Sequence, residues 1–184
     1  MKKILPLLAL LLLLTSCSNK WTVDRSNMPD GLRTQYEQSI QVSEAALDVN
    51  DNDIEALFQI AFAYEQLGDY RNAVDYYKKV LEQNPNEPVT LNNLAAIYED
   101  MKDYAQAAEY IKQLYILQPD NVETIRDTVR ILLEAGDLAH AQEALENFIL
   151  LSQEAAKTNP NLTSLISDLH QDIVDYQSAH PDQQ

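Results

Sequence analysis

Two consecutive stretches of equal length decide the fold. Residues 54–87 read IEALFQIAFAYEQLGDYRNAVDYYKKVLEQNPNE, and residues 88–121 read PVTLNNLAAIYEDMKDYAQAAEYIKQLYILQPDN. A shift of 34 residues aligns the same kinds of side chain in both, and several matches continue into the following stretch. The aligned sets are Leu57, Leu91 and Ile125; Tyr64, Tyr98 and Leu132; Asp69, Asp103 and Asp137; Ala73, Ala107 and Ala141; and Pro85 and Pro119. The chain therefore contains an internal repeat.

Each repeat unit has the pattern of two helices joined by a tight turn. In the first stretch, Leu57, Ile60, Ala61 and Tyr64 have the i, i+3, i+4, i+7 spacing of one helix face. Asp53 precedes them as a predicted N-cap, and Gly68 breaks the pattern at the turn. A second apolar face follows, and Pro85 ends it because proline cannot continue a helix interior.

This pattern resembles the tetratricopeptide repeat (TPR). The resemblance implies an all-α fold, an α-solenoid of helix-turn-helix repeats with flanking cap helices. The third unit is degenerate, since it has Thr128-Val129 where Leu-Ala is usual and Gln153 where proline is usual. We predict a cap helix or degenerate half repeat at 31–53, TPR 1 at 54–87, TPR 2 at 88–121, a degenerate TPR 3 at 122–158, and a C-terminal cap helix with a frayed tail at 159–184.

The N-terminus has the features of an export signal. A positive start is followed by an apolar run of 11 residues from Ile4 to Leu14, too short for the roughly 20 that span a bilayer. The stretch Leu14-Thr15-Ser16-Cys17 resembles the bacterial lipobox, which implies removal of residues 1–16 and lipidation of Cys17. A plain secreted protein with a chance cysteine is the alternative. Residues 17–30 are predicted to be the lipidated cysteine and a tether, which would hold the acidic domain off the bilayer.

Composition and motifs argue against several functions. The chain has 13 Lys+Arg against 29 Asp+Glu, a net charge of −16, which disfavours nucleic acid because phosphates require basic partners. Its one cysteine and three separated histidines match no metal-ligand or nucleophile motif, and no glycine loop could cradle a phosphate. We therefore expect no enzymatic activity, no metal, no cofactor and no small-molecule substrate.

The remaining expectation is a protein-binding surface. In TPR domains the first helix of each pair lines a concave face, and the resemblance places there Phe58, Phe62, Glu65, Asn92, Asn93, Ala96, Glu99, Arg126 and Arg130. An aromatic pair and an arginine pair, each four residues apart, would suit a peptide with an apolar end and an acidic end. Alternatively, Phe62 packs on the preceding cap helix and both arginines form surface ion pairs.

These features predict a lipid-anchored TPR adaptor that binds a protein or peptide partner at the bacterial cell envelope. Ser18 rather than Asp follows the lipobox cysteine, which favours the outer membrane if the organism has one. A homo-oligomeric envelope lipoprotein, assembled through its terminal helix or a repeat edge, is the alternative function.

Overall fold

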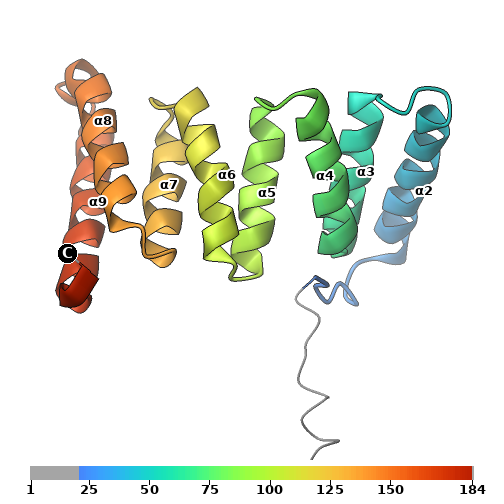
Figure 1. The fold of residues 1–184 in the computed structure, drawn as a ribbon, viewed down its shortest axis with the longest axis horizontal. Helices are drawn as coiled ribbons and strands as arrows, with labels where there is room; N and C mark the ends of the chain where they lie inside the picture. Colours follow the sequence, from blue (N-terminus) through green and yellow to red (C-terminus); the bar gives the residue numbers. More distant parts are fainter. Residues whose placement is uncertain (1–20, 184) are drawn as a thin grey trace, which may run out of the picture. The chain divides into compact units, whose positions relative to one another are not determined.

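The computed structural model describes residues 21–183, and all its regular elements within this range are helices (Figure 1). The predicted signal peptide and the lipobox cysteine Cys17 lie outside the described residues. The elements are α2 (Asp30–Leu47), α3 (Ile54–Leu67), α4 (Tyr70–Gln83), α5 (Pro88–Asp100), α6 (Tyr104–Leu117), α7 (Val122–Glu134), α8 (Leu138–Ala156), α9 (Pro160–Ala179) and the short 3-10 helix η1 (Pro181–Gln183). None of the described helices combines the length and the apolar character needed to cross a membrane.

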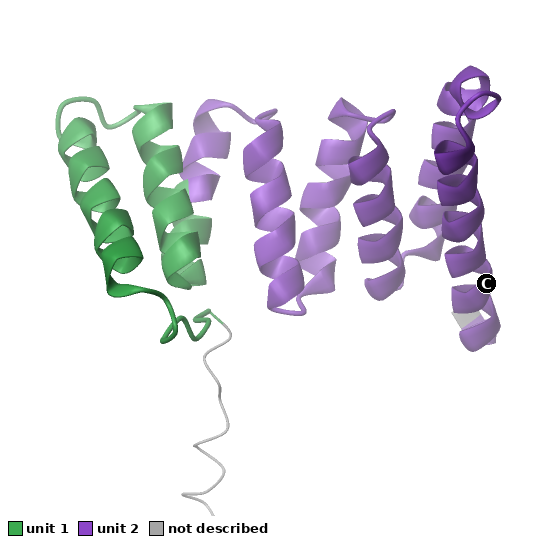
Figure 2. Ribbon diagram, turned by 180° about the vertical axis from the view of Figure 1, so that it is seen from behind, with its two compact units in different colours: residues 1–76 green, residues 77–184 purple. Residues whose placement is uncertain are grey.

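The chain divides within α4 into two compact units (Figure 2). Unit 1 ends at Tyr76 and contains α2 and α3, whereas unit 2 begins at Tyr77 and contains α5 to α9. In unit 1, Ile40 of α2 packs against Ile60 and Ala63 of α3. The side chain of Asp53 accepts a hydrogen bond from the backbone N–H of Ala56, which confirms the predicted N-cap of α3.

Unit 2 is a stack of antiparallel helices in which each helix packs on the next along the chain, from α5 to α9. Its core contains the apolar residues that the repeat pattern aligns, including Leu91, Ile111, Ile125 and Leu132. The last helix, α9, packs on α8 and also reaches α7. It therefore covers the end of the stack in the position that a further repeat would occupy.

The turn after each first helix has the same backbone geometry in all three repeats. Gly68, Lys102 and Gly136, spaced by 34 residues, have positive φ angles of 80°, 57° and 78°. At each turn the N–H of this residue and the N–H of the following aspartate bond to carbonyls of the preceding helix, at 2.7–3.0 Å. These bonds satisfy the last-turn carbonyls of α3, α5 and α7. The sequence period is thus also a period of backbone conformation.

The third repeat tolerates its unusual residues for identifiable reasons. Thr128 is fully buried, but its hydroxyl donates to the carbonyl of Thr124 at 2.7 Å, so this hydroxyl is satisfied. Without a proline at Gln153, α8 continues for 19 residues, compared with 14 for α4 and α6.

Both ends of the described chain are more ordered than the sequence predicts. The tail was predicted to fray from Ala179, but Pro181–Gln183 forms η1, and the ring of His180 stacks on Tyr176 with centroids 4.2 Å apart. Residues 21–29, predicted as part of a free tether, are instead bonded to unit 1. Backbone hydrogen bonds to Gly68 and Tyr70 hold this segment in place, and such bonds leave no apolar period in the sequence.

The turn geometry predicts that Lys102→Gly stabilises the protein. A residue with a Cβ at positive φ pays a steric cost that glycine avoids, so we expect the free energy of unfolding to rise by about 1 kcal/mol. Urea denaturation followed by circular dichroism measures this change. The matched control Gln106→Gly, at an exposed helical site of α6, should lower the free energy of unfolding by about 1 kcal/mol. A destabilised Lys102→Gly protein would contradict the argument.

Candidate binding groove

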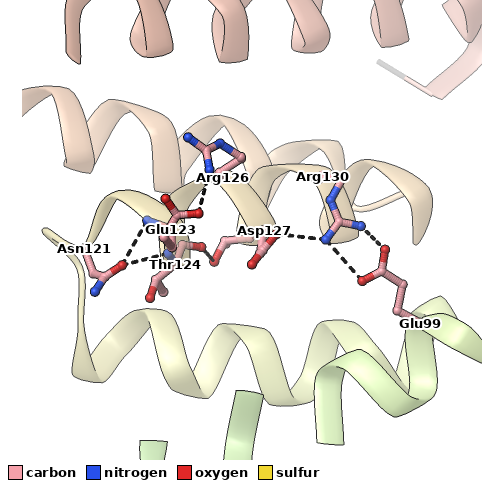
Figure 3. Close-up of polar contacts among 8 residues, drawn as sticks. Glu99, Asn121, Glu123, Thr124, Arg126, Asp127 and Arg130 are labelled. Atoms are coloured by element: carbon pink, nitrogen blue, oxygen red, sulfur yellow. Dashed lines mark hydrogen bonds and ion pairs between the residues drawn. The ribbon is translucent and has the colours of Figure 1, made fainter. Parts of the chain in front are cut away.

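The exposed face of α7 carries a row of paired charges (Figure 3). The helix begins at the N-cap Asn121, whose side-chain oxygen accepts from the backbone N–H groups of Glu123 and Thr124 at 2.9 and 3.0 Å. One turn on, Arg126 forms an ion pair with Glu123 at 2.5 Å. These two residues are three apart, so the helix itself brings them together.

Arg130 connects α7 to α5. Its guanidinium contacts both carboxylate oxygens of Glu99, one of them at 3.1 Å, and also pairs with Asp127 at 2.9 Å (Figure 3). The planar guanidinium suits this two-oxygen contact, which fixes the spacing between neighbouring first helices of two repeats. Both arginines are therefore already paired with acids of the same chain.

A groove of about 900 Å³ lies beside this row, between α7 and α9 of unit 2. Leu133, Leu169 and Tyr176 form its apolar floor. The two leucines are buried, and Tyr176 is partly exposed. Smaller hollows extend it toward α5 and toward the start of α9. Two basic side chains line the groove and its extensions, Arg126 and Arg130. Six acidic side chains line them as well: Glu99, Asp127, Glu134, Asp168, Asp172 and Asp175.

The electrostatics of this groove favour positive charge. Acids outnumber bases along it, and the two bases are paired. Burial raises the pKa of Asp127, and the nearby negative charge of Glu123 raises it further. A cation placed there would relieve the repulsion among these carboxylates.

The structure places five predicted residues beside this groove: Asn92, Ala96, Glu99, Arg126 and Arg130. Asn93 is directed elsewhere, since its side-chain amide donates to the hydroxyl of Tyr77 at 2.7 Å. This hydrogen bond joins α5 to the part of α4 that belongs to unit 2.

Phe58, Phe62 and Glu65 belong to α3 in unit 1 and do not line this groove. Phe62 is 37% exposed, and its ring meets Tyr36 of α2 edge-on with centroids 6.2 Å apart. The contact of Phe62 with the cap helix and the ion pairs of both arginines are the contacts that the alternative reading expects.

Sequence reasoning missed the acidic side chains of α9. Asp168, Asp172 and Asp175 have the i, i+4, i+7 spacing of one helix face and line the groove or its extension. The spacing of the three aspartates is present in the sequence, but acids on one face of an amphipathic helix equally indicate a solvated surface. Within residues 21–183, no group of three histidine, cysteine or acidic side chains is arranged to hold a metal ion.

Comparison with known families identifies the repeats. Two family models described as tetratricopeptide repeat match the chain, one over residues 54–87 and the other over residues 76–109. The chain therefore contains tetratricopeptide repeats. Comparison with curated protein sequences gave no match.

Solved structures share the fold. A MamA RS-1 double mutant has 18% sequence identity and a TM-score of 0.56, with 79% of this chain and 86% of that chain covered. A MamA protein has 14% identity and a TM-score of 0.58 over 67% and 68% of the two chains. A putative kinesin light chain from Podospora anserina with TPR-like repeats has 14% identity and a TM-score of 0.52 over 81% and 90%. At these identities the similarity establishes an α-solenoid of TPR type and nothing finer.

The contact between α5 and α7 predicts a measurable coupling between Arg130 and Glu99. Because both side chains are partly exposed, we expect a double-mutant cycle of Arg130→Ala and Glu99→Ala to give a coupling energy of about 0.5–1 kcal/mol. Urea denaturation of the four proteins measures it. The pair Arg126 and Glu123 lies within one helix and is more exposed, so its cycle should give about 0.3 kcal/mol. Equal coupling in the two cycles would contradict the bridging role of Arg130.

Proposed function

We propose that this chain is a lipid-anchored TPR adaptor of the bacterial cell envelope, which binds a basic segment of a protein partner in the groove of unit 2. The observation that carries the proposal is the groove itself, an apolar floor between α7 and α9 with an acidic rim. The adaptor has no catalytic role in this proposal.

The character of the proposed ligand follows from the charge and shape of the groove. An acidic peptide end, which the arginine pair alone would suggest, would have to displace Glu99, Asp127 and Glu123 from the two arginines. A peptide with lysine or arginine side chains would meet the rim carboxylates of α9 without breaking any of these pairs. Its apolar side chains would cover the partly exposed ring of Tyr176.

The anchor rests on the sequence. The only cysteine of the chain stands at the last position of Leu14-Thr15-Ser16-Cys17, directly after the short apolar run. Several acyl chains on one residue would hold the protein stably, since each buried CH₂ contributes about 0.8 kcal/mol. The outer membrane is the proposed location where the organism has one.

Charge reversal tests the groove. We expect a basic, partly apolar peptide of about twelve residues to bind more tightly than an acidic peptide of the same apolar content, because the rim is acidic. The variant Asp172→Lys/Asp175→Lys should weaken binding of the basic peptide about tenfold or more, measured by fluorescence anisotropy. The control Glu146→Lys/Glu154→Lys makes the same charge change on exposed positions of α8 and should bind nearly as well as the wild type. If both variants lost the same amount of binding affinity, net charge alone would explain the effect, and the groove would be rejected as the binding site.

Photo-cross-linking in intact cells tests the partner. A photoreactive amino acid at Ala96, exposed in the hollow that extends the groove toward α5, should capture a protein that carries a basic segment. The same amino acid at Leu150, which is 65% exposed on α8, serves as the matched position outside the groove. Capture of a second copy of this chain from Leu150, with none from Ala96, would favour the homo-oligomer instead.

Substitution of Cys17 tests the anchor. We expect the wild-type chain, expressed in a bacterium, to fractionate with membranes and to begin at an acylated Cys17 by mass spectrometry. Cys17→Ser has no thiol to accept the lipid, so we expect the acyl masses to be absent and the share of the protein in the membrane fraction to fall. An unmodified Cys17 in the wild type would reject the anchor and leave the groove unaffected.

A further inference from the structure

The first described residues form a clip on unit 1, which we define as residues 21–29. The backbone N–H of Tyr70 donates to the carbonyl of Trp21, and the N–H of Val23 donates to the carbonyl of Gly68, both at 2.9 Å. Thr22 and Asp69 form an antiparallel bridge between these two bonds. The clip therefore pairs with the turn between α3 and α4 like one short strand with another, and then leads into α2.

The turn between α3 and α4 has a glycine where the clip passes over it. A Cβ at Gly68 would lie 2.5 Å from the carbonyl oxygen of Val23 and 3.0 Å from the side chain of Arg25, so only glycine fits beneath the clip. Gly68 is buried, whereas Lys102 and Gly136 at the equivalent turns are exposed. The clip thus distinguishes the first repeat turn from the other two.

The clip also gathers the basic side chains of unit 1. Residues 21–76 contain three basic residues against 11 acids, and all three are at the clip. Arg25 is part of it, Arg33 donates to the carbonyl of Arg25 at 2.9 Å, and the guanidinium of Arg71 lies 6.0 Å from the ring centre of Trp21. Four acids, Asp24, Asp30, Glu65 and Asp69, belong to the same end. This end therefore has a net charge of −1, whereas the rest of unit 1 has a net charge of −7.

From this geometry we infer that the clip end of unit 1 lies against the lipid headgroups. The inference rests on the proposed lipid at Cys17. Only three residues separate Cys17 from Trp21, so the anchor and the clip can be at most about 14 Å apart. Because Trp21 is bonded to Tyr70, the lipid holds the turn between α3 and α4 at the membrane rather than suspending the domain on a long tether. A tryptophan ring beside arginines is the kind of surface that suits the lipid–water interface, and this end has little of the acidic excess that anionic lipids repel.

Fluorescence quenching tests this orientation with the lipidated full-length chain. The protein is placed in vesicles of phosphatidylethanolamine and phosphatidylglycerol at about 3:1, which include a lipid with a nitroxide on its headgroup. Trp21 is the sole tryptophan, so a reporter can be moved by pairing Trp21→Phe with one new tryptophan. Arg71→Trp puts the reporter on α4 beside the clip, and the wild-type chain, with Trp21 as its own reporter, measures the same end with both side chains in place. Val49→Trp puts it after the far end of α2, whose 18 residues span about 27 Å.

We expect the headgroup nitroxide to quench the tryptophan at position 71 about threefold more than the one at position 49, given the length of α2. Insertion of about twenty Gly/Ser residues between Lys20 and Trp21 adds a flexible span of roughly 25 Å and should lower quenching at position 71 to the level at position 49. Circular dichroism checks that each variant keeps the helical content of the parent.

The outcomes separate this inference from the proposed function. Mass spectrometry of the same sample reports whether Cys17 carries lipid. Lipid on Cys17 with equal quenching at positions 71 and 49 would overturn the orientation and leave the anchor intact. An unmodified Cys17 would overturn the anchor and this inference together, whereas the groove of unit 2 would still be tested by its own variants.

Discussion

The left-handed residue after the first helix of each repeat is the constraint on which the rest of the structure depends. At Gly68, Lys102 and Gly136 the positive φ angle lets two backbone N–H groups bond back to the helix that has just ended. The same geometry turns the chain so that the next helix runs back along the first. Ala73, Ala107 and Ala141, five residues later at each turn, are all fully buried, because the small side chain lets the paired helices approach closely.

Repetition of this constraint explains why aromatic pairs recur. Tyr64 stacks on Tyr76 with ring centroids 6.0 Å apart, and Tyr98 stacks on Tyr110, 34 residues further on, at 5.7 Å. In the third repeat the equivalent positions are Leu132 and Ala144, so no ring pair forms there, and the hydroxyl of Tyr115 donates to the carbonyl of Ala144 instead. The third repeat therefore keeps its helix packing without a stacked tyrosine pair and has a hydrogen bond at Ala144.

The helices could be predicted from the sequence, whereas the contacts that give the surface its character could not. Apolar spacing is a local property, so Leu57 to Tyr64 predict α3 and Asp53 predicts its start. The clip is held by backbone groups of Trp21 and Val23. Because all residue types have such backbone groups, no side-chain pattern in the sequence predicts the clip. Arg130 has one partner, Asp127, at helical spacing, but its second partner, Glu99, is 31 residues away and becomes a neighbour only through the stacking of repeats.

Ion pairs within the chain reverse the ligand charge that Arg126 and Arg130 would be expected to favour. As isolated residues, Arg126 and Arg130 suggest an acidic ligand. In the folded chain each is held by carboxylates, and the unmatched charge that remains along the groove is negative. A charged side chain can attract a ligand only to the extent that its neighbours leave its field uncompensated. The same reasoning applies at the clip, where three arginines offset three of four acids. This end of unit 1 is therefore far less acidic than the rest of the unit.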